Sequence, residues 1–464
     1  MHGWLPITVQ VIAGILLIAA IGWRNRSWRL VWLPWATLVG ITLAVAAYWY
    51  IASQGLSDES NPAPYSLWIW IGLSGVAAGV LIAGWRGARW WRRGASALAV
   101  PLCVLCAALA LNLWVGYFPT VQNAWNQLTS GPLPDQTDTA TVVAMQKRHA
   151  IPPQGTVVPV SIPNTASGFK HRGELVYLPP AWYATDPPPP LPTVMMVGGE
   201  FNTPADWMRA GNAVTTIDDF AAAHGGNAPV FVFVDSGGAF NNDTECVNGT
   251  RGNAADHLTK DVVPFMISNF RVLPNRTNWG VVGWSMGGTC AVDLTVMHPD
   301  MFSAFEDIAG DLTPNSGNKA QTIARLFGGN AAAYAAFDPT TVITRHGLYA
   351  GVAGWFDING LPRTSPSSKV VKTAANLNDQ TAAANSLCAT GSANGIKCAV
   401  VTQPGKHDWP FAARAFAAGL PWLASRLGTP GVPVVPLPAL PPDPPPVPPP
   451  GRPHSTLNLQ AAAK

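Results

Sequence analysis

The residues best suited to carry out chemistry form the run Gly283-Trp284-Ser285-Met286-Gly287-Gly288. It has the pattern G-x-S-x-G and lies between an apolar segment, 279–282, and a helix-like segment, 289–298. A sharp turn between a strand and a helix lifts a serine hydroxyl above a sheet, and flanking glycines relieve the crowding there. The pattern alone is weak, because chance gives on the order of 0.2 matches in a chain this long. Its context predicts a nucleophilic Ser285, with a buried serine in a glycine-rich connection as the alternative.

A serine hydroxyl needs a base within hydrogen-bond reach, and the base needs an orienting carboxylate. When the serine occupies such a turn, the acid and then the histidine follow it along the chain. We predict that the base is His407, which lies in a glycine-bearing loop after the last predicted strand, at 403–410. The other downstream histidines end a helix, precede a strand or lie in the tail: His298, His346 and His454.

The predicted acid is Asp357, which directly follows a predicted strand at 347–354. Catalytic side chains gather at the carboxyl edge of a parallel sheet, where this residue would lie. Asp307 and Asp311 follow the preceding strand and remain alternatives. Asp408 is adjacent to the predicted base and is expected to point elsewhere.

Backbone N–H groups must hold the negative charge that develops on the substrate oxygen, and each typically contributes about 10²- to 10³-fold in rate. One is expected from Met286, which directly follows the serine. The other is expected from the loop Gly198-Gly199-Glu200-Phe201, through the N–H of Glu200 or Phe201. A glycine turn without a ligand role is the alternative for this loop.

Composition indicates a chain that lies partly in lipid. Of the 464 residues, 48% are hydrophobic and only 11% are charged, and 20 are tryptophan. An ordinary soluble protein is less apolar than this. The net charge of +3 and the lack of a long basic run argue against nucleic acid as a partner.

Residues 1–119 are predicted to form an all-α transmembrane domain of four helices. Each span has about 20 residues without Asp, Glu, Lys or Arg, which is enough to cross a bilayer core. A cleaved signal peptide is excluded because three more spans follow the first. The expected spans are 5–23, 30–51, 67–85 and 95–118.

Arginines predict the orientation of these spans. They gather in the loop after the first span and in the loop after the third, whereas the loop between the second and third contains Asp58 and Glu59. The positive-inside rule places both arginine loops in the cytoplasm, and the N-terminus and everything after the fourth span outside. The spans carry no ionisable residue, so we expect an anchor in the plasma membrane rather than an ion pathway. They could also hold a lipid or a partner.

The exported part is divided into a linker at 120–153, with one short helix near 142–148, a catalytic domain at 154–428 and a tail at 429–464. Short apolar runs alternate with helical runs in the catalytic domain, which predicts a doubly wound, mostly parallel α/β sheet. The tail has thirteen prolines between 430 and 453 and is expected to be disordered or polyproline-like. Expected strands are 174–178, 193–197, 230–234, 279–282, 302–308, 347–354 and 397–402. Expected helices are 254–269, 289–298, 369–388 and 411–426.

The four cysteines of the exported domain are an even set, and an oxidising exterior would allow two disulfides. Cys388 and Cys398 close a short loop and are the favoured pair, which leaves Cys246 with Cys290. Within the exported domain no C-x-x-C or histidine pair stands at metal-ligand spacing, so neither a metal nor another cofactor is expected.

The chain from about residue 155 to 423 resembles the esterase D and mycolyltransferase (antigen 85-type) family of α/β-hydrolases. The resemblance rests on motifs in the same order: Val176-Tyr177-Leu178-Pro179-Pro180, Gly198-Gly199, the run around Ser285, His298-Pro299-Asp300-Met301-Phe302, and Gly405-Lys406-His407-Asp408-Trp409. It implies an α/β-hydrolase fold, with ester hydrolysis or acyl transfer through an acyl-serine and with Ser285, Asp357 and His407 in the triad places.

Two features depart from that family. Secreted mycolyltransferases normally have a cleaved signal peptide and a glutamate as the acid, whereas four spans and an aspartate are expected here. The leading hypothesis is a membrane-anchored extracytoplasmic serine esterase or acyltransferase acting on lipid or glycolipid esters of a cell envelope. The alternatives are a non-catalytic binding module on a hydrolase fold and a membrane protein whose spans carry the function.

Overall fold

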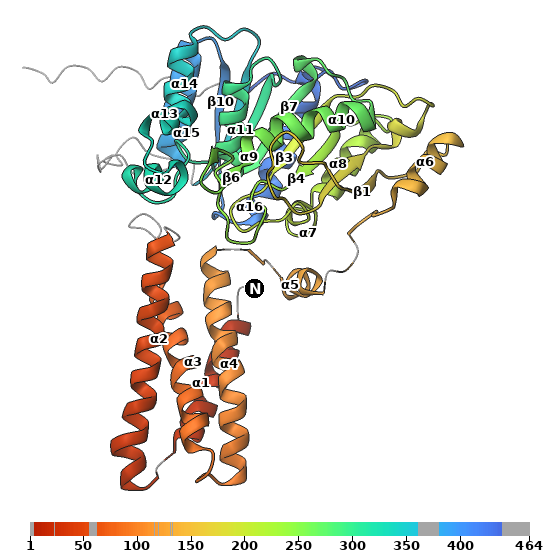
Figure 1. The fold of residues 1–464 in the computed structure, drawn as a ribbon. Coiled ribbons are helices and arrows are strands. Elements are labelled where there is room, and N and C mark those ends of the chain that lie inside the picture. The colour runs from red at the N-terminus through yellow and green to blue at the C-terminus, as the bar shows by residue number, and fades with distance from the viewer. Residues whose placement is uncertain are drawn as a thin grey trace, which may run out of the picture.

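The computed structural model describes residues 4–22, 24–54, 63–115, 117–118, 120–129, 131, 133–360 and 380–438. The first described residues form four long helices that pack into a bundle (Figure 1). A short π-helical turn, η1 (Trp28–Trp32), precedes the second helix. The four helices are α1 (Trp4–Ile21), α2 (Leu33–Gln54), α3 (Tyr65–Gly84) and α4 (Trp90–Val115).

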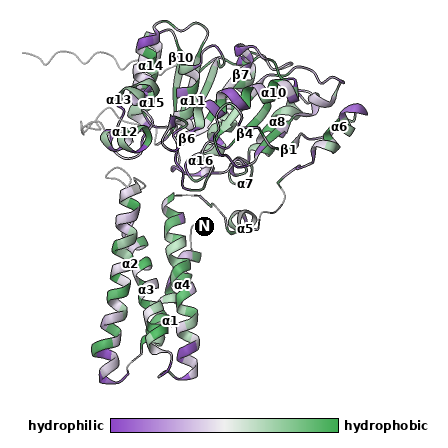
Figure 2. Cartoon of the chain, viewed as in Figure 1, coloured by the Kyte–Doolittle hydropathy of each residue, from purple (hydrophilic) through white to green (hydrophobic). Residues whose placement is uncertain are grey.

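All four helices are long and apolar enough to cross a membrane. Large apolar side chains point away from the bundle, and those of Ile18, Trp49 and Ile82 are each 72% exposed. Figure 2 shows mostly hydrophobic residues along the helices and hydrophilic residues at the end that bears the arginine loops. Apolar surface of this extent is stable in lipid but not in water. The four helices therefore suggest a membrane anchor.

Small residues allow the bundle helices to approach closely. A Cβ atom added to Gly75 of α3 would lie 2.8 Å from the Cα of Gly40 in α2, and one added to Gly79 would lie 2.8 Å from the Cβ of Ala36. Close backbone approach at small residues is a common way for helices to pack in a membrane, where water supplies no hydrophobic driving force.

An eight-stranded sheet forms the centre of the catalytic domain, in the order β1-β2-β4-β3-β7-β8-β9-β10. β2 pairs antiparallel with both β1 and β4, and the remaining pairs are parallel, which confirms the predicted α/β fold class. The strands are β1 (Thr156–Val160), β2 (Glu174–Leu178), β3 (Thr193–Val197), β4 (Val230–Val234), β7 (Trp279–Trp284), β8 (Ala304–Ile308), β9 (Ala353–Asn359) and β10 (Lys397–Gln403). A separate hairpin joins β5 (Asn248–Gly249) and β6 (Gly252–Asn253).

Helices cover both faces of the sheet. One face packs against α8 (Ala213–Ala223) and α16 (Trp409–Arg426), through buried side chains such as Ile217 and Phe416. The other packs against η3 (His257–Val262), α10 (Val263–Phe270), α11 (Met286–Met297), α14 (Pro339–His346) and α15 (Gln380–Ala393). The remaining elements are α5 (Val121–Leu128), α6 (Thr139–Lys147), η2 (Pro180–Tyr183), α7 (Asp206–Arg209), α9 (Ala254–Asp256), η4 (Arg276–Asn278), α12 (Lys319–Phe327) and α13 (Ala331–Phe337).

The observed elements differ from the predicted ones at several places. The strand expected at 347–354 is instead β9, because Gly347 and Gly351 have positive φ angles of 80° and 71° and form a turn. The helix expected at 369–388 begins at Gln380 in the described chain, and its earlier part lies outside the described residues. β1 was not predicted, and the linker holds two helices, α5 and α6, where one was expected.

The start of the proline-rich tail packs against the catalytic domain. Thr429 is buried, and the side chains of Val432, Val435 and Leu437 contact the core that includes α16. The N–H of Val435 donates a hydrogen bond of 3.1 Å to Ser425 Oγ. The expectation of disorder from residue 429 is therefore wrong for 429–438, because its valines and leucine supply apolar surface between the prolines. Residues 439–464 lie outside the described chain.

Both expected disulfides are present. Cys246 is bonded to Cys290, which ties the helix after Ser285 to the segment before β5, and Cys388 is bonded to Cys398. Their Cα atoms are 5.6 and 5.7 Å apart, within the usual range for a disulfide. Cys103 and Cys106 are buried in the bundle as free thiols.

We expect the Cys246–Cys290 bond to stabilise the catalytic domain more than the Cys388–Cys398 bond. The first spans 44 residues and the second 10, and loop-closure entropy then gives contributions of about 4 and about 3 kcal/mol. The measurement is thermal unfolding of the full chain in detergent, with each cysteine pair replaced by alanine. Equal losses, or a larger loss without the shorter loop, would contradict this ranking.

Candidate active site

Ser285 lies at the turn between β7 and α11, and its backbone has φ 57° and ψ −121°. Only a few per cent of non-glycine residues have a positive φ, and the strain costs on the order of 1–3 kcal/mol. The surrounding chain holds the residue in place, since its N–H donates to the Ile308 carbonyl at 2.9 Å and its carbonyl accepts from the Gly288 N–H at 2.7 Å. This is the geometry that exposes a nucleophilic hydroxyl at the carboxyl edge of the sheet.

Glycines around Ser285 make this tight turn possible. A Cβ atom at Gly283 would overlap the backbone of Gly287, and one at Gly287 would overlap the Val197 carbonyl of β3. Neither position has room for a side chain, so the glycines of the G-x-S-x-G pattern serve close backbone packing.

His407 meets Ser285 directly. Its Nε2 lies 2.9 Å from Ser285 Oγ, which is the distance expected between a base and its nucleophile. The imidazole stacks on Trp284, with ring centroids 4.2 Å apart and planes 28° apart. Asp408 does point elsewhere, as expected, because its carboxylate caps α16 by accepting from the Phe411 N–H at 3.1 Å.

Burial of His407 lowers its pKa to about 4. Removal of an imidazolium from water is unfavourable, so the ring is neutral at physiological pH. A neutral imidazole with Nε2 next to the serine hydroxyl can accept its proton. Nδ1 of His407 is buried and has no hydrogen-bond partner among the described residues, so it is available to an orienting acid.

Asp357 lies within β9 rather than after a strand, and it is fully buried. It is in register with Ile308 of β8, which in turn is in register with Trp284 next to the nucleophile. Gln403 Nε2 donates to Asp357 Oδ1 at 2.7 Å, and Asp357 Oδ2 has no partner in the described chain. The structure thus leaves an unpaired oxygen on Asp357 and an unpaired nitrogen on His407, with no direct bond between the two in the described part.

The alternation of side chains between the two faces of the sheet favours Asp357 over Asp307 as the acid that orients His407. Asp357 shares a face of the sheet with Trp355, which packs in the same core as Trp284 and α16. Asp307 points to the opposite face, where its Oδ1 accepts from the Gly310 N–H at 2.7 Å and lies under α11. Asp311 Oδ2 accepts from Asn315 Nδ2 at 2.6 Å. Asp357 as the acid remains a prediction.

The loop after β3 lies beside the nucleophile, as the oxyanion hypothesis requires. A Cβ atom at Gly199 would be 3.2 Å from the Cβ of Ser285. Asn202 Oδ1 closes the loop by accepting from the Gly199 N–H at 2.8 Å, and Phe201 has a positive φ of 66°. The donor roles of the N–H groups of Met286, Glu200 and Phe201 stay predictions.

Arg172 braces this loop and was not identified from the sequence. Its guanidinium donates to the Asn202 carbonyl at 2.7 Å and pairs with the buried carboxylate of Asp235 at 2.6 Å. The hydrogen bonds and charge of Arg172 hold the pKa of Asp235 below its usual value, although burial acts in the opposite direction. The only signal in the sequence was an arginine at the end of the run Lys170-His171-Arg172, before a strand.

Glu306 is a second buried carboxyl group that the sequence analysis missed. It is fully buried on the α16 side of β8, and neither of its oxygens has a partner among the described residues. Burial, and then the nearby Asp357 and Asp307, raise its pKa well above the usual value. A Cβ atom at Gly419 would lie 2.5 Å from the carboxyl carbon, so α16 needs a glycine there. An acidic residue within an otherwise apolar strand was the available signal.

Among the described residues, one group has the donors to hold a metal, and it does not lie at the turn that carries Ser285. It consists of His171 before β2, Glu174 at the start of β2 and His257 at the start of η3. The contacts of Ser285 and His407 include none of these three side chains.

Comparisons with known proteins identify the family of the chain. Residues 170–423, more than half of the chain, match the family model named Esterase, which is described as "Putative esterase". An uncharacterized protein of Corynebacterium glutamicum is 25% identical over 434 residues, which cover 91% of this chain and 95% of that protein. The alignment therefore extends into the N-terminal helices. The MPT51 antigen of Mycobacterium leprae is 27% identical over 139 residues, or 28% of this chain and 43% of that protein.

Solved structures of the same class are more distant. An S-formylglutathione hydrolase from Agrobacterium tumefaciens is 16% identical, with a TM-score of 0.47, and covers 59% of this chain and 96% of its own. The MPT51 structure from Mycobacterium tuberculosis is 19% identical, with a TM-score of 0.39, and covers 59% and 99%. Similarity at this level does not bear on the substrate.

The pH dependence of turnover should follow Asp357. Burial raises its pKa to about 7, although the bond from Gln403 opposes the shift. The carboxylate form is needed to support the imidazolium, so kcat/KM should rise with pH through about 7 and be about tenfold below its plateau at pH 6. His407 stays neutral over this range. The measurement is the pH profile of hydrolysis of a soluble ester between pH 5 and 9.

Asp357→Asn is the matched variant for this profile. It should lower the plateau by about 10⁴-fold and abolish the step near pH 7. A flat wild-type profile, or a step that persists in the variant, would contradict the assignment of Asp357.

Proposed function

Because the chain belongs to the Esterase family, we propose that it is a membrane-anchored, extracytoplasmic serine esterase or acyltransferase that acts on lipid or glycolipid esters. The observation that carries this proposal is the contact of 2.9 Å between His407 Nε2 and Ser285 Oγ, at a backbone turn that exposes the hydroxyl. A serine without a base would be a poor nucleophile at neutral pH.

The reaction has two halves. Ser285 Oγ attacks the carbonyl carbon of the ester as His407 Nε2 takes its proton, and the N–H groups of Met286 and of Glu200 or Phe201 hold the oxyanion. His407 then returns the proton to the leaving alcohol as the C–O bond breaks, which leaves an acyl-serine. Water or a sugar hydroxyl, deprotonated by His407, attacks the carbonyl carbon of the acyl-serine. As the bond from that carbon to Ser285 Oγ breaks, His407 returns the proton to Oγ, and the acyl group leaves as a free acid or as a sugar ester.

An aromatic pair at the oxyanion loop supports a long acyl chain. Half-buried Phe201 of that loop contacts Phe240, with ring centroids 5.3 Å apart, and Phe240 is 65% exposed. An exposed apolar ring that packs on this loop offers a surface on which an alkyl chain can leave water.

Buried carboxyl groups near the same loop support an alcohol rich in hydroxyls. Burial and Asp243 raise the pKa of Glu200, and burial raises the pKa of Asp243 to about 6. Burial and then Asp243 raise the pKa of Glu245 well above its usual value. Arg251 supplies a nearby positive charge, with its Nη1 3.4 Å from Asp243 Oδ2. Carboxyl groups of this kind can donate hydrogen bonds to sugar hydroxyls and accept hydrogen bonds from them. A negatively charged alcohol would be disfavoured beside them.

The end of the fourth helix lies close to the active-site edge. The hydroxyl of Tyr117, just after α4, donates to Asp206 Oδ2 at 2.7 Å. The same carboxylate oxygen accepts from the Thr203 N–H, directly after the oxyanion loop. This contact supports access to the active site from a bilayer surface.

The arginine loops lie at the end of the bundle opposite the catalytic domain (Figure 1). Together with the positive-inside rule, this arrangement supports a catalytic domain outside the cytoplasm. The two disulfides, which persist in oxidising surroundings, support the same location.

The proposal predicts that the full chain in liposomes cleaves long-chain esters faster than short ones. Phe240→Ser should reduce kcat/KM for a long-chain ester by about tenfold, because apolar contact with the chain is lost, and should leave a short-chain acetate ester nearly unchanged. The measurement is release of a chromogenic alcohol from esters of increasing chain length.

Two variants serve as controls for this experiment. Val434→Ser removes another exposed apolar side chain, on the tail, and should have no effect on chain-length preference. Ser285→Ala should remove the activity. Folded wild-type protein that cleaves no ester and passes no acyl group to a sugar would instead indicate the binding module.

A further inference from the structure

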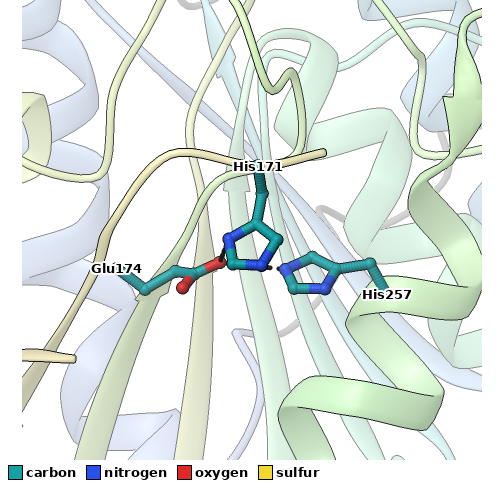
Figure 3. A group of neighbouring side chains, drawn as sticks. All are labelled: His171, Glu174 and His257. Carbon is teal, nitrogen blue, oxygen red and sulfur yellow. Dashed lines mark hydrogen bonds and ion pairs between the residues drawn. The ribbon is translucent and has the colours of Figure 1, made fainter. Parts of the chain in front are cut away.

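A compact group of donor atoms joins the start of β2 to η3. His171, Glu174 and His257 each offer one ligand atom, and these atoms lie within 4.8 Å of one another. Figure 3 shows the two imidazole rings and the Glu174 carboxyl group facing one another. Glu174 and His257 are fully buried, and the side chain of His171 is 10% exposed.

The hydrogen bonds of His257 determine which of its nitrogens faces the group. Its Nδ1 lies 3.3 Å from Asp261 Oδ2, so Nδ1–H can donate to that carboxylate. A carboxylate on one ring nitrogen is the usual support for a histidine that binds a metal through the other. In this tautomer Nε2 carries no proton and faces Glu174 Oε1 at 2.9 Å. Two lone pairs at that distance repel unless a proton or a cation lies between them.

The hydrogen-bond partners of His171 also indicate which of its ring nitrogens carries the proton. Its Nδ1 lies 2.8 Å from the Arg172 carbonyl oxygen and 2.9 Å from Glu174 Oε1, so Nδ1–H can donate to these oxygens. The other ring nitrogen, Nε2, is then unprotonated. The two rings stack with centroids 4.2 Å apart and planes 21° apart.

Burial favours a cation among these donors. The carboxyl groups of Glu174 and Asp261 are both buried, and Glu174 Oε2 has no partner among the described residues. A divalent cation bound here would offset the cost of burying the two carboxyl groups and would also satisfy the free carboxyl oxygen.

We propose that His171, Glu174 and His257 bind a divalent transition metal of the zinc class, with Asp261 orienting His257. Two imidazoles and a carboxylate are a donor set that Zn²⁺ accepts. Tetrahedral bonds of about 2.0–2.1 Å place ligand atoms roughly 3.3 Å apart. The 2.9 Å between His257 Nε2 and Glu174 Oε1 needs to widen by only a few tenths of an ångström, and the three ligand atoms already lie within 4.8 Å of one another.

The metal would brace the oxyanion loop from outside the active site. Arg172 lies between two of the ligands in sequence, and its guanidinium holds the Asn202 carbonyl. Asn202 in turn holds the Gly199 N–H beside Ser285. A cation that fixes residues 171–174 against η3 would fix this arginine as well.

The expectation that the chain has no metal rested on spacing along the sequence. His171 and His257 are far apart in the chain and become neighbours only when β2 packs against η3. Ligands that are brought together by the fold leave no local spacing pattern, so the sequence analysis could not detect them.

The test is the metal content of the full chain, purified in detergent without chelators. We expect about one Zn²⁺ per chain by elemental mass spectrometry in the wild type, and less than a tenth of that in Glu174→Gln and in His171→Asn. When excess Zn²⁺ is added back to metal-free wild type, the unfolding midpoint should rise by roughly 5 to 10 °C relative to the metal-free protein. Neither variant should show that shift. His149→Ala, which removes an exposed histidine elsewhere, is the matched control and should bind like the wild type.

Zinc that remains in both ligand variants would place the ion elsewhere and overturn the proposal. A wild type that binds no Zn²⁺ or Co²⁺, and whose unfolding midpoint neither ion moves, would also overturn it and leave a proton-bridged group. If a variant fails to fold, Co²⁺ titration of the wild type, read by visible absorption, still decides between nitrogen-and-oxygen ligation and none. These readouts do not depend on catalysis, so they stand apart from the proposed function.

Discussion

Ser285 can present its hydroxyl only because its backbone is held in a conformation that isolated serine avoids, with φ 57° and ψ −121°. The chain offsets this strain by local means. Gly283 and Gly287 permit backbone contacts that no side chain would allow, and the Ile308 carbonyl of the neighbouring strand holds the serine N–H. The parallel register of β3, β7 and β8 is therefore tied to the turn, because β8 supplies the carbonyl that accepts from Ser285 and β3 packs its Val197 carbonyl directly against Gly287.

The elements after the sheet bring the base to this fixed point. His407 follows β10, stacks on Trp284 and is kept in place by the start of α16, where Asp408 caps the helix. Burial keeps the imidazole neutral, which suits a base. The same burial places Glu306 and Asp357 in a poorly solvated layer beneath α16, where their pKa values rise. Burial under α16 thus accounts both for the neutral imidazole of His407 and for the raised pKa values of the two carboxyl groups.

Much of this arrangement could be predicted from the sequence, because local patterns encode it. The apolar runs of β2, β3 and β4 were placed with the observed bounds, and the four long apolar helices, both disulfides and the Ser285–His407 pair followed from hydropathy, cysteine count and loop position. The misses share a cause. β9 was displaced because glycines with positive φ cannot be told from strand glycines, and Arg172, Glu306 and the His171 group gain their roles only from contacts between distant segments.

Reaction of the full chain with a fluorophosphonate probe, followed by peptide mass spectrometry, tests the central claim most directly. An activated serine forms a covalent phosphonyl adduct, so the account predicts one adduct on Ser285, no adduct in Ser285→Ala, and labelling slowed by about 10³-fold or more in His407→Ala. Labelling of His407→Ala at the wild-type rate, or no labelling of a demonstrably folded wild type, would contradict it.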